Sequence, residues 1–129
     1  MLSLPKQHKI QAFRRINSMN MNRMVLVQLQ QLISTFKFNK LTNEYKADKN
    51  VRRFSTWNLL QTMLYAHLTN KRSIRDICTG LSSVKNRWHH LGFVSVSRNN
   101  LSNSLAKRSH EVFEKTFYQL LNKVQFDMH

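Results

Sequence analysis

The sequence has few of the residues that build disulfides and tight turns, with one cysteine, one proline and two glycines among 129 residues. A lone Cys78 excludes an internal disulfide and fits a reducing compartment. The shortage of glycine and proline argues against a turn-rich β-sandwich and against a glycine-rich phosphate-binding loop. No apolar run approaches the roughly 20 residues that cross a bilayer, so we expect no membrane-spanning segment and no partner within a membrane.

Acidic residues are also scarce, because 6 Asp and Glu stand against 21 Lys and Arg and leave a formal net charge of +15. Nucleic acid is the usual polyanion for a small domain of this kind. A membrane surface, a translation or chromatin particle, and a merely soluble basic protein are the alternatives. Hydrophobic residues at 41% argue against full disorder, and the length suits one domain.

Residues 1–20 differ from the rest, because they hold the only proline and several cations but no acidic residue. They are predicted to be a flexible basic arm, or an extension produced by a misplaced start. One helical domain is expected over residues 21–126.

Apolar residues recur at helical spacing along that domain. The spacing predicts helices over residues 25–36, 38–45, 57–68 and 109–124, with a basic loop over 46–53. The predicted core face of the first helix contains Val25, Leu29, Leu32, Ile33 and Phe36, and that of the last contains Val112, Phe113, Phe117, Leu120, Leu121 and Val124.

A capping pattern at Ser73 and Asp76 predicts a short helix over residues 73–80 that Gly80 ends. An irregular connection over 82–97 follows, and then a polar helix over 99–108. This order is that of a helix-turn-helix unit. The expected fold is therefore all-α, with about five to six helices and a helix-turn-helix-like unit.

The residues that could support catalysis do not converge. Three of the six acids, Asp76, Glu111 and Glu114, fall in first helical turns, where capping and the helix dipole explain them. Cys78, His89, His90 and His110 lack the spacing of a zinc site. We therefore expect no enzyme activity, no catalytic residue, no metal and no cofactor in this chain.

The basic residues gather at helix starts, in loops and on the polar helix, whose asparagines can bond base edges. The alternative is that these residues only cap and solvate a surface helix. The predicted DNA-binding residues are Arg52, Arg53, Lys71, Arg72, Arg75, Arg98, Asn99, Asn100, Asn103, Lys107 and Arg108.

The order of several short motifs resembles the N-terminal domain of bacterial insertion-sequence transposases. A basic-aromatic step at Arg52-Arg53-Phe54 is followed by Trp57 and by a Ser-Ile-Arg-Asp start at residues 73–76. The segments HHLG at 89–92, SRNNLSNSLAKR at 97–108 and VFEKTFYQLL at 112–121 also fit, so the resemblance covers residues 21–124.

This resemblance implies a domain that binds double-stranded DNA at terminal inverted repeats, near the nucleoid in a bacterial cytoplasm. A complete member would add an RNase H-like catalytic domain that uses divalent metal through Asp, Asp and Glu. This chain stops before the first family carboxylate, so we expect a truncated or split copy. The alternatives are a protein-interaction module that pairs with itself or inhibits full-length transposase, and a non-functional remnant.

Overall fold

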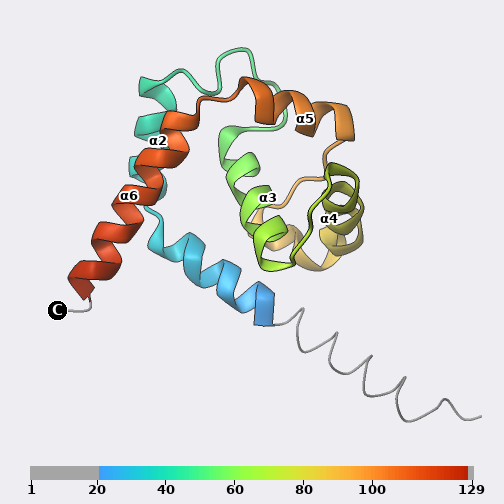
Figure 1. Cartoon of the computed structure of the whole chain (residues 1–129), viewed down its shortest axis with the longest axis horizontal. Coiled ribbons are helices and arrows are strands. Elements are labelled where there is room, and N and C mark those ends of the chain that lie inside the picture. Colours follow the sequence, from blue (N-terminus) through green and yellow to red (C-terminus); the bar gives the residue numbers. More distant parts are fainter. Residues whose placement is uncertain (1–20, 128–129) are drawn as a thin grey trace, which may run out of the picture.

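Helices form most of the chain in the computed structural model, which describes residues 21–127 (Figure 1). No strand occurs in that part, so the predicted all-α class is confirmed there. The predicted arm over residues 1–20 lies outside the described residues. The elements are a helix over 21–32, α2 (Thr35–Glu44), α3 (Thr56–Leu68), α4 (Ile74–Trp88), a 3-10 turn η1 (His89–Leu91), α5 (Arg98–Lys107) and α6 (His110–Asp127).

Serine begins four of these helices. In each case the serine hydroxyl accepts a hydrogen bond from the backbone N–H three residues on, which satisfies a group that the first turn leaves unpaired. At α3 the cap is reciprocal, because the Asn58 side chain also accepts from the Ser55 backbone. The capping pairs are Ser34 with Lys37, Ser55 with Asn58, Ser73 with Asp76 and Ser97 with Asn100.

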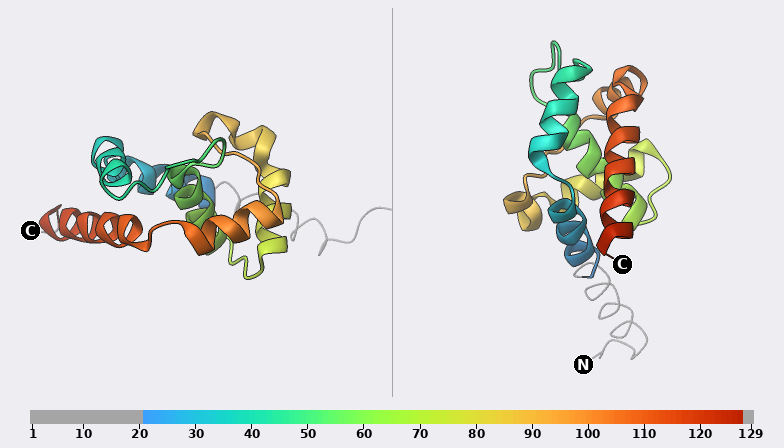
Figure 2. Two further views of the ribbon diagram at one scale, coloured as in Figure 1. Left: turned by 90° about the horizontal axis from the view of Figure 1, so that it is seen from above. Right: turned by 90° about the vertical axis from the view of Figure 1, so that its left-hand side faces the viewer.

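Two clusters of buried side chains share α3. The larger lies between α3, α4, α5 and the first helix, and its centre is a set of edge-to-face rings from Tyr65, Trp88 and Phe93, with centroids 5.7 to 6.3 Å apart. The smaller lies between α2 and α6, around Phe38 and Val112. Figure 1 and Figure 2 show α2 beside α6, with α3 between this pair and α4.

The helix predicted over residues 73–80 is longer than expected, because α4 continues to Trp88 and Gly80 lies in its middle. Gly80 is buried against α3, where a Cβ atom would collide with the Tyr65 hydroxyl. Glycine is therefore required by the close approach of the two helices and not by a helix end. The predicted irregular connection shrinks to residues 89–97, and α4 packs directly on α5.

The predicted core faces of the first and last helices are partly wrong. The first helix ends at residue 32, and Phe36 lies in α2 with 77% of its surface exposed. On α6 only one narrow face touches the body, so Phe117 is 57% exposed and Leu121 and Val124 are also exposed. The spacing of apolar residues identifies an apolar stripe on a helix. It does not show how much of that stripe packs against another element.

Replacing Gly80 by alanine should destabilise the fold by about 1–3 kcal/mol, although alanine is normally the better helix former. The cause is the contact with the Tyr65 hydroxyl, so a Tyr65→Phe background should reduce the cost of Gly80→Ala. Urea denaturation of the four proteins measures both effects. An equal cost in the two backgrounds would contradict the assigned contact.

Candidate nucleic-acid interface

A hollow of about 890 Å³ opens between the loop that joins α2 to α3 and the side of α5. We call it the basic hollow. Figure 1 shows that loop lying next to α5, at the upper edge of the molecule. The lining residues are Tyr45, Lys46, Ala47, Lys49, Asn50, Val51, Arg52, Arg53, Phe54, Asn100, Asn103, Ser104, Lys107, Arg108 and Ser109.

The charge of this lining has one sign. Lys46, Lys49, Arg52, Arg53 and Lys107 are exposed, and none of them forms an ion pair within residues 21–127. No Asp or Glu belongs to the described lining. Five converging cations without carboxylate partners create a positive potential that favours a polyanion.

The α5 wall of the hollow follows directly from helical spacing. Asn100, Asn103 and Lys107 stand at positions i, i+3 and i+7, so they share one face. Leu101 and Ser104 are the buried residues of α5 and fix its rotation against the core. Two amides and an ammonium group therefore face the cations of the loop.

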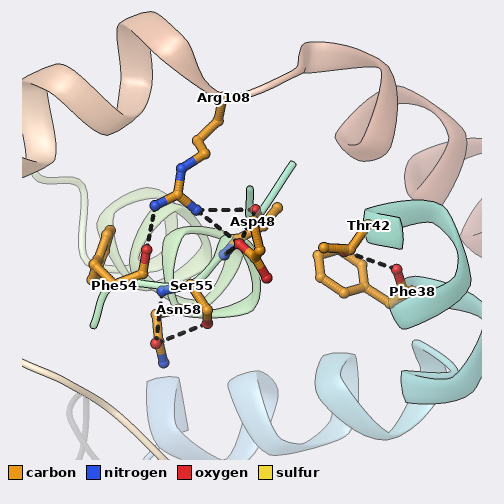
Figure 3. A network of polar contacts seen from close by, with 8 residues as sticks. Phe38, Thr42, Asp48, Phe54, Ser55, Asn58 and Arg108 are labelled. Carbon is orange, nitrogen blue, oxygen red and sulfur yellow. Dashed lines mark hydrogen bonds and ion pairs between the residues drawn. The ribbon is translucent and has the colours of Figure 1, made fainter. Parts of the chain in front are cut away.

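Arg108 joins the two walls of the hollow (Figure 3). Its Nη1 donates to Asp48 Oδ1 at 3.1 Å and to Thr56 Oγ1 at 3.0 Å, while Nη2 donates to the carbonyl oxygen of Phe54. Its side chain is only 9% exposed. Because the first contact is near the start of the loop and the other two are at its end, Arg108 fastens the whole loop to the α5–α6 junction.

Asp48 is the acceptor at the centre of this junction. Its Oδ1 also accepts from the Thr56 backbone N–H and the Thr56 hydroxyl, both at 2.7 Å. Burial lowers the pKa of the Arg108 guanidinium, and the Asp48 charge opposes that change. Arg108 remains charged at neutral pH, since an arginine pKa stays far above 7.

The structure brings together only part of the predicted set. Arg52, Arg53, Asn100, Asn103, Lys107 and Arg108 line the basic hollow, although the Arg108 donors are engaged internally. Lys71, Arg72, Arg75, Arg98 and Asn99 do not line it.

The predicted set omitted two lysines of the hollow, Lys46 and Lys49, which belong to the loop already noted as basic. The positive charge of that loop could be read from the sequence and pointed to these two lysines. The path of the loop could not be read in this way, because it depends on left-handed backbone at Lys46 (φ 51°) and Asn50 (φ 63°).

The residues considered for zinc do not gather. Within residues 21–127, no three His, Cys, Asp or Glu side chains come close enough to hold a metal ion. His90 instead contacts Arg23, with 2.9 Å between His90 Nε2 and Arg23 Nη2. Among the same residues, no helix is both long and apolar enough to span a membrane.

Helical packing around α3 and a hollow lined by cations define a small all-α domain with a basic surface between its α2–α3 loop and α5. The chain belongs to a family whose model, described as a domain of unknown function (DUF4372), matches residues 21–94. This family is commonly found in transposase-like proteins. No curated protein and no solved structure matches the chain.

Replacing Arg108 by methionine should lower the free energy of unfolding by about 2 kcal/mol, because the Phe54 carbonyl and Asp48 lose their charged donor. Arg53→Met is the matched control on the same hollow. Arg53 is exposed, so its loss should stay within about 0.5 kcal/mol. Thermal or urea unfolding distinguishes the two, and similar losses would argue against the fastening role.

Proposed function

We propose that this domain binds double-stranded DNA, with the basic hollow on the phosphate backbone and α5 at the base edges. The finer proposal is that it is the DNA-binding N-terminal domain of an insertion-sequence transposase, directed at terminal inverted repeats. The proposed role of the domain is DNA binding alone, and we assign no chemical step to its residues.

One observation carries the proposal: five exposed cations from two separate parts of the chain converge on one hollow without a carboxylate in its lining. A solvated basic surface needs no such convergence. Phosphate groups along a nucleic-acid backbone are the regularly spaced anions that several fixed cations can neutralise together.

The asparagines on α5 distinguish DNA from a general polyanion. Asn100 and Asn103 lie one turn apart on the same face, next to Lys107. Asparagine can bond the N6 and N7 atoms of adenine in the major groove, whereas lysine holds phosphate. The occurrence of the family in transposase-like proteins supports this choice of partner.

Neutralising the hollow should weaken the salt dependence of binding. For the Arg52→Gln, Arg53→Gln, Lys107→Gln variant, the slope of log K against log salt should shrink by about 2.7, since each phosphate contact contributes about 0.9. Fluorescence anisotropy of the full chain with a mixed-sequence duplex of about 24 base pairs measures the slope.

A variant with the same change in net charge is the control. Lys37 and Lys40 on α2 and Lys123 on α6 are exposed and lie outside the lining of the basic hollow. Changing all three to glutamine should leave the slope nearly unaltered. Equal slopes for the two triple variants would sink the phosphate-binding role of the hollow.

Sequence reading by α5 has its own test. Selection from a random duplex library should yield a preferred sequence for the full chain. Asn103→Ala should then lose about 1–3 kcal/mol of discrimination at one base pair of that sequence, with a smaller change on scrambled DNA. If the losses on the two duplexes are the same, Asn103 does not read a base.

A second candidate function is self-association, favoured by the exposed apolar side chains Phe117, Leu121 and Val124. They stand at i, i+4 and i+7 on the part of α6 that projects from the body (Figure 2). A second copy could cover them. Light scattering without DNA should then give twice the monomer mass for the full chain, and the Phe117→Ser, Leu121→Ser variant should restore the monomer mass.

A further inference from the structure

We infer that α5 enters the major groove between two basic sets that hold opposite strands, one in the basic hollow and one at the turn between α3 and α4. This inference rests on the proposed function and deepens it. It assigns a DNA-binding role to the predicted residues that do not line the basic hollow.

The second set consists of Lys71, Arg72, Arg75 and Arg98, all of them exposed. The turn that carries the first two is well ordered, because the Lys71 N–H donates to the Ala66 carbonyl at 2.9 Å. Burial raises the pKa of the Cys78 thiol, and the Arg98 charge works against that rise. The Arg98 charge therefore lies within electrostatic reach of Cys78 on α4.

The two basic sets lie on opposite sides of α5. The loop over residues 45–54 leads into the N-terminus of α3, and the turn over 69–73 leaves its C-terminus. The 13 residues of α3 separate these ends by about 20 Å. Seen from above in Figure 2, α5 runs between the loop and the turn.

The face of α5 between these sets is small and polar. Asn99, Ser102, Asn103 and Ala106 stand at i, i+3, i+4 and i+7, and all four are exposed. Large side chains are missing from this stripe, so the helix backbone can come close to a surface. Asparagine and serine can bond base edges, and alanine can contact a thymine methyl group.

The dimensions agree with a helix inside a groove. A helix with its side chains is about 10–12 Å across, and the major groove is about 12 Å wide. Cations placed on both sides of such a helix reach the phosphates that border the groove, and these belong to different strands. A single strand offers only one such border.

Comparison of duplex with single strand tests this arrangement. The Lys71→Gln, Arg72→Gln, Arg75→Gln variant of the full chain should bind a mixed-sequence duplex about tenfold more weakly, yet bind one strand of that duplex within about twofold of the wild type. Anisotropy near physiological salt measures both. The Lys37, Lys40 and Lys123 triple glutamine variant controls for net charge.

A second variant tests entry of the helix without changing any charge. Ser102→Leu, Ala106→Leu adds bulk to the exposed stripe and keeps good helix formers. It should also weaken the duplex selectively.

Equal losses on duplex and single strand, or no loss on either, would overturn the two-strand arrangement. The triple variant in the basic hollow distinguishes a failure of the two-strand arrangement from a failure of the proposed function. Arg52→Gln, Arg53→Gln, Lys107→Gln should weaken both probes, and an unchanged affinity for both would refute DNA binding by the hollow itself.

Discussion

The position of the basic hollow depends on one arginine. Arg108 bonds Asp48, Thr56 and the Phe54 carbonyl at once, and it sits where α5 passes into α6. A rigid guanidinium fork can satisfy several acceptors that a flexible ammonium group would satisfy one at a time. The two cores share α3 and also α6, which contributes Phe113 to the larger core and Val112 to the smaller one. The Arg108 fork is a further tie between them, and it determines how far the cation-bearing loop stands from the asparagines of α5.

Local patterns predicted the helices well, because serine caps and apolar spacing act within a few residues. Ser73 caps α4 as the sequence indicated. Gly80 was misread, because a glycine at a helix end and a glycine under a neighbouring ring look alike in one sequence. The distinction depends on Tyr65, which lies on another helix, so no local rule could make it.

The candidate site was predicted by residue type but not by position. The clusters around Arg52 and Lys107 were identified from charge, yet their convergence depends on long-range packing. Arg108 was predicted to bind DNA because basic residues gather around the polar helix. Its internal role instead requires Asp48, which is 60 residues away in the sequence.

The unpaired charge of the hollow has a thermodynamic consequence for the domain itself. Five cations held near one another repel in the folded state and separate when the chain unfolds. Any anion that occupies the hollow removes this repulsion and binds the native state in preference, so folding and anion activity are linked. The domain should therefore be least stable in dilute salt without a bound anion, and phosphate or polyphosphate alone should raise its melting temperature.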